Sequence, residues 1–290
     1  MRLQSGRSRH IRFAFAVAVL FVIALALPPV RTKIKALAHE ADVAWFGEHL
    51  QDVWGHFALG EDWARVHPLR QPQDYAWLDD AGPSPVRIAH ALGDSGGPEA
   101  NSVAAMRRAV AAGMRLLEVD LSLEAGGELR CAHDPGTPRA AQACTFESLM
   151  AALPAGAWVV LDIKSDFAAT GERVVQALRA DGRARQVVFQ LYRPEDVALF
   201  KRWQAQLDLP GPIVTAYLSH RSVDTVAREG ARLGVRAFTL PMWRLAAFSH
   251  RPDGLSMFVH PVHDCEAWHE AQAARVRGIY TRTDVRCGHG

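Results

Sequence analysis

The chain has 290 residues, 49% of them hydrophobic, which is enough for one large core. The formal charge is +2, but seven basic residues precede the first acidic one, Glu40, and the rest of the chain carries 26 basic against 31 acidic side chains. This mildly acidic remainder lacks the basic field that non-specific nucleic-acid binding requires, so no nucleic-acid partner is expected.

The first predicted element is a signal-anchor within residues 1–38. Residues 13–30, FAFAVAVLFVIALALPPV, carry no charge and have basic residues on both sides. This length is at the short end of the roughly 17–25 apolar residues that span a bilayer. A cleaved signal peptide is the alternative, because Ala36-Leu37-Ala38 resembles a small-residue cleavage site. The preferred interpretation is an uncleaved anchor, with the membrane as a partner.

The four cysteines fall into two local pairs, Cys131 with Cys144 and Cys265 with Cys287. Two short-range disulfides would fit an oxidising compartment, and free thiols are the alternative. A zinc site is less favoured, because no Cys-x-x-Cys pair is present. Together with the anchor, this pattern predicts that the globular part lies in the periplasm or the extracellular space.

After a Trp-rich, helical lead-in over residues 39–82, short apolar strands alternate with helical stretches through residues 83–290. The expected strands are 86–89, 116–121, 158–163, 187–191, 213–217, 237–240, 257–260 and 278–281. The expected helices between them include 102–112, 171–180, 195–206 and 223–233. Eight strands alternating with helices predict an α/β chain folded as a (β/α)₈ TIM barrel. An open doubly wound sheet is the alternative, but the usual Gly-rich phosphate loop is missing after the first strand.

Polar side chains gather where the early strands end, which is where such barrels carry their reacting groups. Glu118 and Asp120 are two residues apart and therefore share one face of their strand, and the same spacing relates Asp162 to Lys164. The histidines at strand ends are His90 and His133.

This composition predicts a metal-dependent acid–base site. Three converging carboxylates, from Glu118, Asp120 and Asp162, need a cation, and hard oxygen ligands favour Mg²⁺ or Ca²⁺. A structural carboxylate pair is the alternative interpretation. The chain has only four lysines, so Lys164 at a strand end indicates a compact point charge that suits a phosphate oxygen. Two neighbouring histidines fit paired acid–base catalysis near neutral pH.

Later strands end in further polar residues that could line a substrate pocket. These are Gln190 and Tyr192, Thr215 and Tyr217, and His260 and His263.

The ordered set of His90, Glu118-x-Asp120, His133 and Asp162-x-Lys164 resembles the PI-PLC-like phosphodiesterase superfamily. That superfamily includes the glycerophosphodiester phosphodiesterases and their sphingomyelinase D-like relatives, and the resemblance extends over residues 86–284. It implies a TIM barrel, a catalytic pair His90 and His133, metal ligands Glu118, Asp120 and Asp162, and a phosphate contact from Lys164. A Cys131–Cys144 disulfide would resemble that of the sphingomyelinase D-like branch.

The chain departs from the family pattern at three places. His90-Ala91-Leu92 stands where His-Arg-Gly is usual, and Asp162 stands where Glu is common. In Pro98-Glu99-Ala100-Asn101, Ala100 takes the position of a ligand Glu if Asn101 matches the family Asn, which would place Asn101 among the substrate-binding residues. These departures bring the chain nearer the sphingomyelinase D-like side.

The resemblance implies a phosphoric diester hydrolase acting on glycerophosphodiesters or (lyso)phospholipids. One variant of this reaction attacks phosphorus with the substrate's own hydroxyl and forms a cyclic phosphate. Two hypotheses without catalysis also fit the sequence. The chain could be a catalytically retired barrel used for binding, or a lipid-surface adaptor based on the lead-in.

Overall fold

The computed structural model describes residues 51–52, 55, 60–82, 85–134, 144–217, 219 and 221–287. All of these belong to one compact unit of the chain. The predicted anchor at 13–30 and the alternative cleavage site lie outside the described residues. Within the described part, no helix combines the length and apolar character needed to cross a bilayer.

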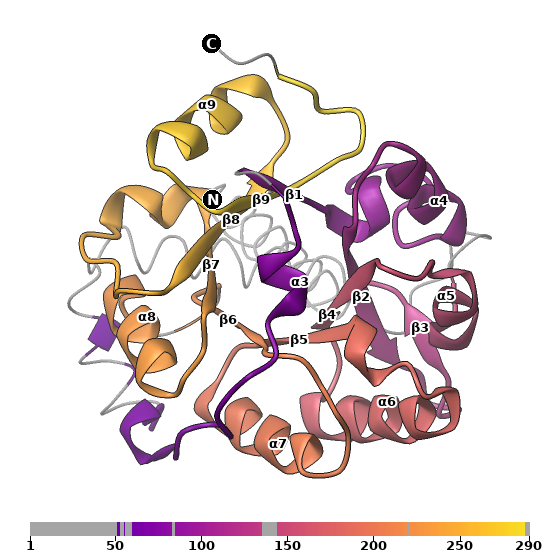
Figure 1. Ribbon diagram of the computed structural model, residues 1–290, viewed down its shortest axis with the longest axis horizontal. Helices are drawn as coiled ribbons and strands as arrows, with labels where there is room; N and C mark the ends of the chain where they lie inside the picture. Colours follow the sequence, from indigo (N-terminus) through magenta and orange to yellow (C-terminus); the bar gives the residue numbers. More distant parts are fainter. Residues whose placement is uncertain are drawn as a thin grey trace, which may run out of the picture. The chain divides into compact units, whose positions relative to one another are not determined.

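Across the described ranges, eight parallel strands close into a barrel (Figure 1). In order around the barrel they are β1 (Val86–Ala89), β2 (Leu116–Leu123), β4 (Trp158–Ile163), β5 (Val187–Leu191), β6 (Ile213–Thr215), β7 (Ala237–Pro241), β8 (Ser256–Val262) and β9 (Gly278–Thr281). β3 (Leu129–Cys131) adds to β2 in the antiparallel direction. Because β1 pairs with both β2 and β9, the predicted barrel is confirmed and the open sheet is excluded.

Helices cover the outside of the barrel (Figure 1). They are α4 (Val103–Ala111), α5 (Phe146–Ala152), α6 (Phe167–Asp181), α7 (Pro194–Gln204), α8 (Val223–Arg232) and α9 (Cys265–Ala273), with short 3-10 turns η2 (His90–Gly93), η3 (Ala184–Gln186) and η4 (Met242–Ala247). Side-chain caps set where several of them begin. The side chains of Ser102, Asp166 and Ser222 each accept a bond from a backbone N–H in the first turn, which satisfies a donor that the helix leaves open.

The last part of the lead-in closes the bottom of the barrel. In its described part, Gln51, Asp52 and Gly55 are helical, and two short helices follow, η1 (Trp63–Arg65) and α3 (Ala76–Asp79). The rest of residues 60–82 is irregular, as Pro68 and Pro72 would require. Trp77 on α3 is fully buried and donates to Gly211 O at 2.9 Å, so α3 seals the N-terminal ends of the strands.

Alternation along the strands places polar groups in a single layer inside the barrel. The interior just above α3 is apolar and is lined by Ile88, Leu116, Val160, Val188, Ile213, Ala237, Phe258 and Tyr280. Two residues further along, most of these strands carry a polar side chain on the same face: His90, Glu118, Asp162, Gln190, Thr215, Thr239 and His260. The closed apolar floor therefore leaves these inward polar groups on the side of the C-terminal mouth.

Both predicted cysteine pairs are disulfides. Cys131 bonds Cys144, with Cα atoms 5.2 Å apart, and Cys265 bonds Cys287, with Cα atoms 5.5 Å apart. The first ties the end of β3 to the start of α5, and it closes the loop that carries His133. The second fixes the chain after β9 to α9.

Candidate active site

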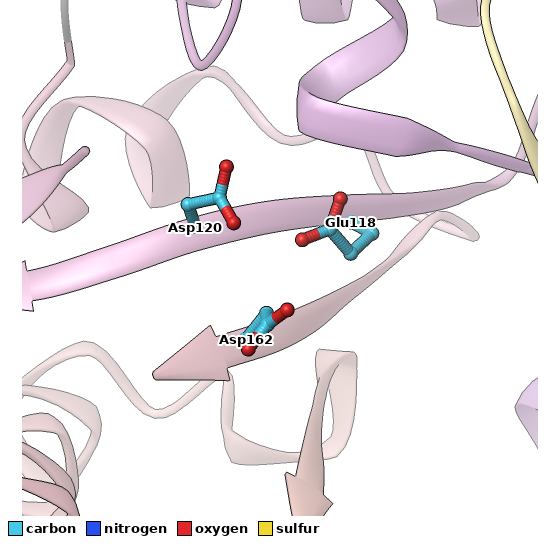
Figure 2. A group of neighbouring side chains, drawn as sticks. All are labelled: Glu118, Asp120 and Asp162. Carbon is cyan, nitrogen blue, oxygen red and sulfur yellow. The ribbon is translucent and has the colours of Figure 1, made fainter. Parts of the chain in front are cut away.

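Three carboxylates meet at the mouth of the barrel (Figure 2). Glu118 and Asp120 lie on β2, and Asp162 lies on β4, directly beside Asp120 in the strand register. One oxygen of each lies within 4.8 Å of the others, so the three could hold a metal ion. The spacing of two residues within β2 and the parallel pairing of β2 with β4 produce this convergence.

Lys164 supplies positive charge inside this cluster. Its Nζ lies 2.6 Å from Asp162 Oδ2 and 3.2 Å from Asp120 Oδ1. Burial works against the charge, but Asp162, Tyr192 and Asp120 raise the pKa of Lys164 well above its usual value. Against its own burial, Lys164, His133 and the hydrogen bond from Asn101 lower the pKa of Asp120.

Glu118 is the uncompensated member of the cluster. It is 1% exposed, and although its Oε2 accepts a bond from Ala91 N at 2.7 Å, its Oε1 has no hydrogen-bond partner among the described residues. Burial, followed by the charges of Asp120 and Asp162, raises the pKa of Glu118 well above its usual value. An orphaned buried oxygen in an all-oxygen donor set fits a hard divalent cation such as Mg²⁺ or Ca²⁺.

The turn after β1 presents backbone groups to the cluster. Ala91 and Leu92 have positive φ, 50° and 61°, and this conformation points Ala91 N at Glu118. Gly93 follows with φ 99°, and a Cβ there would collide with Thr283 Oγ1. The turn after His90 therefore holds the Glu118 carboxylate through the backbone N–H of Ala91.

Asn101 supports Asp120 through both ends of its amide. Its Nδ2 donates to Asp120 Oδ2 at 2.8 Å, and its Oδ1 accepts from Asp120 N at 3.0 Å. Asn101 has φ 58°, a left-handed conformation that Asn tolerates better than most residues. Glu99, two residues earlier, instead pairs with Arg108 on α4.

Two of the predicted pocket residues face the cluster from β5 and β8. Gln190 is buried and bonds Tyr192 and Tyr280. His260 packs edge-on against the rings of Tyr217 and Tyr280, with centroids 5.4 and 5.6 Å away. Tyr217 itself lies just beyond β6, which ends two residues earlier than predicted.

His90 lies in the polar layer near the carboxylates. Burial lowers its pKa to about 4, although Asp120 acts in the opposite direction, so it is neutral at pH 7. Its Nδ1 is buried without a hydrogen-bond partner among the described residues. Its ring lies 5.7 Å from that of His263, which also has a lowered pKa through burial and Arg282.

His133 stands at the open edge of the site. Its side chain is 47% exposed, and its Nδ1 lies 3.4 Å from Asp134 Oδ1. Its charge contributes to the lowered pKa of Asp120, which places it within electrostatic reach of the cluster. His90 and His133 thus both lie within electrostatic reach of the carboxylates, His90 half-buried and His133 exposed.

His260, inside the barrel, makes stability depend on pH. Burial, followed by the neighbouring His90 and Lys164, lowers the pKa of His260 to about 3 from the ordinary 6.5. Below pH 6.5 this histidine is therefore protonated in the unfolded chain but stays neutral in the folded chain. The free energy of unfolding decreases as the pH is lowered from 7 to 5. We expect urea unfolding with chelator present to show that His260→Phe loses about 2 kcal/mol less than wild type between pH 7 and pH 5.

The exposed His269 on α9 provides the control for this measurement. His269→Phe should keep the wild-type dependence on pH. Equal losses in wild type and His260→Phe would show that His260 titrates normally in the folded chain.

Two contributors to the site are absent from the sequence-based prediction. Ala91 acts through its backbone N–H, which no sequence motif reveals. Tyr280 reaches Gln190 from β9 because it faces inward in GIYT, and strand alternation alone could have indicated this.

The fold and the site together define a (β/α)₈ barrel with a buried carboxylate cluster, a lysine and histidines at its C-terminal mouth. No protein-family model matches the chain, and no curated protein does.

Solved structures do match, and several of them are described as glycerophosphodiester phosphodiesterases. The one from Thermotoga maritima has a TM-score of 0.55 at 15% identity, with 69% of this chain and 95% of that chain covered. One from Parabacteroides distasonis has a TM-score of 0.54 at 18% identity, covering 67% and 91%. A phosphodiesterase from Oleispira antarctica, in complex with the product sn-glycerol-3-phosphate, has a TM-score of 0.52 at 14% identity, covering 67% and 92%. The predicted resemblance is therefore confirmed at the level of the fold.

Proposed function

We propose that the protein is a metal-dependent phosphoric diester hydrolase acting on glycerophosphodiesters or (lyso)phospholipids. The observation that carries the proposal is the carboxylate cluster with its orphaned Glu118 Oε1, set beside Lys164 and His90 at the mouth of this barrel. The shared fold with glycerophosphodiester phosphodiesterases supports the substrate class.

Glu118, Asp120 and Asp162 would hold Mg²⁺ or Ca²⁺, and Asn101 and Ala91 N would orient two of them. When bound, the cation would neutralise charge on the phosphate and polarise its oxygens. Lys164 offers a second positive charge to a phosphate oxygen at the same place.

The two histidines divide the proton transfers. His90 is neutral at pH 7, so it can accept the proton of a water molecule whose oxygen attacks phosphorus. The P–O bond to the alcohol then breaks, and His133 donates a proton to the leaving oxygen. The products are a phosphomonoester and an alcohol. Tyr217 and His260 line the approach and would contact the substrate's alcohol portion.

The location of the chain is part of the same proposal. Residues 13–30 would anchor it in a membrane, with the barrel in the periplasm or the extracellular space. The two disulfides support an oxidising compartment. A membrane anchor would place the site near lipids and lipid-derived headgroups.

The test is turnover by the full chain, purified in detergent, on glycerophosphodiesters and lysophospholipids with Mg²⁺, Ca²⁺ or chelator. We expect turnover that requires a divalent cation. Phosphorus NMR of the products distinguishes a phosphomonoester from a cyclic phosphate, and a cyclic product would replace water by a substrate hydroxyl as the attacking group. Absence of turnover on every substrate by folded protein that binds metal would refute this substrate class.

A further inference from the structure

A line of hydrogen bonds crosses the barrel and ends on a proposed metal ligand. Tyr280 Oη on β9 donates to Gln190 Oε1 on β5 at 3.0 Å. Gln190 Nε2 donates to Tyr192 Oη at 2.9 Å, and Tyr192 Oη donates to Asp162 Oδ1 on β4 at 2.6 Å. We call these three residues, Tyr280, Gln190 and Tyr192, the tyrosine relay.

The chemistry of the groups fixes the direction of the relay. A glutamine amide has one accepting and one donating end, so an Oε1 that accepts from Tyr280 leaves Nε2 to face Tyr192. Tyr192 Oη accepts that bond and has only one proton, which it must give to Asp162. The relay therefore presents a donor to Asp162 Oδ1 and restricts the rotation of this carboxylate.

The relay and Lys164 hold the two oxygens of Asp162 from different sides. Tyr192 Oη bonds Oδ1 and Lys164 Nζ bonds Oδ2, both at 2.6 Å. With both oxygens held, the plane of the carboxylate is fixed relative to Asp120 and Glu118. Ligand orientation of this kind, set by partners behind the ligand, controls metal affinity.

Burial assigns the relay to positioning. Gln190 is 3% exposed and Tyr280 is 2% exposed, and each polar atom of the Gln190 amide has a tyrosine hydroxyl as its partner. The sequence pattern predicts that Gln190 contacts substrate. In the structure both ends of its amide are hydrogen-bonded inside the barrel, one hydrogen bond behind Tyr192.

We propose that Tyr192 is a positioning residue that orients Asp162 for the divalent cation, and that Gln190 and Tyr280 hold Tyr192 in place. The inference rests on the proposed function, since it assumes that Asp162 is a metal ligand. It adds support to Asp162 on β4 from Tyr192 just beyond β5, which is held in turn by Gln190 on β5 and Tyr280 on β9.

The test is titration of the purified chain with Mg²⁺ and with Ca²⁺ by calorimetry, without substrate. Tyr192→Phe deletes only the hydroxyl, and we expect the dissociation constant to rise about 10- to 100-fold. Tyr280 is separated from Tyr192 by two further hydrogen bonds, so Tyr280→Phe should raise the dissociation constant by a smaller factor.

Tyr75→Phe is the matched control. Tyr75 is also a buried tyrosine whose hydroxyl makes two hydrogen bonds, to Pro212 O and from Arg236 N, but these lie at the closed end of the barrel. It should lower Tm while leaving the dissociation constant unchanged, which separates orientation of a ligand from general stability.

The outcomes distinguish this inference from the proposed function. If wild type binds the cation and folded Tyr192→Phe binds it within about twofold of wild type, the relay has no role in metal binding. If wild type binds neither cation, the metal-dependent function and the relay inference both fall. A rise for Tyr192→Phe equal to that of Tyr75→Phe would reduce the relay to a structural feature.

Discussion

Replacing His90 by alanine is expected to lower kcat for the phosphodiester about 10²- to 10⁴-fold, the usual contribution of a positioned acid or base. His90 is neutral, borders the carboxylates and has no hydrogen-bond partner at Nδ1 among the described residues, so its removal breaks no hydrogen bond there. The chain should therefore stay folded and keep its affinity for divalent cation. Steady-state kinetics beside metal titration measure both.

The control for this loss is His269→Ala, on the exposed face of α9, which should turn over at the wild-type rate. His133→Ala should cause a loss of similar size. Because the two histidines serve one reaction, the double variant should lose much less than the product of the single losses. If His90→Ala retains more than about a tenth of the wild-type kcat, His90 is not the acid or base of the reaction.

Strand periodicity carried most of the fold prediction. The eight expected strands correspond to the eight barrel strands of the described chain, because each is a short apolar run that is buried on both faces. The sequence did not reveal that α3 closes the floor of the barrel. Tyr75 and Trp77 pack there against strand residues that are distant in the sequence, and no local pattern indicates these contacts. The predicted strand 213–217 is two residues too long. β6 ends at Thr215, whose Oγ1 accepts a hydrogen bond from Tyr217 N.

The carboxylates could be predicted because their contacts follow from local spacing. Glu118 and Asp120 share a face by alternation, and β2 and β4 bring Asp162 beside them. The contact of His263 with His90 could not be derived in this way. Between Val259 and Val262, β8 has one residue more than β9, and this irregularity changes the alternation that a regular strand would impose.

Replacing Glu118 by glutamine is expected to have opposite effects on stability and on metal binding. In the metal-free chain, burial and two neighbouring carboxylates disfavour the charge on Glu118, and its raised pKa means that ionisation at pH 7 costs folding free energy. Glutamine keeps the size and can still accept from Ala91 N, but it carries no charge. With chelator present, the free energy of unfolding should rise. The dissociation constant for Mg²⁺ or Ca²⁺ should rise more than about 100-fold, since even residues behind metal ligands change affinity 10- to 100-fold.

A gain in stability without metal together with a loss of metal affinity distinguishes a metal site from a structural carboxylate pair. If Glu118 served only the fold, glutamine would break the arrangement and lower Tm in chelator. If it is a ligand, added cation should raise Tm in wild type and leave Glu118→Gln almost unchanged, because only a state that binds the cation is stabilised by it. Exposed Glu270 on α9 supplies the control, and Glu270→Gln should alter neither Tm nor affinity. A Glu118→Gln variant that is less stable without metal, or that still binds it tightly, would return the cluster to a structural role. If both expectations hold, the mutual repulsion of the three carboxylates lowers stability without metal and is relieved by the cation, and the stability measurement and the metal titration test one effect each.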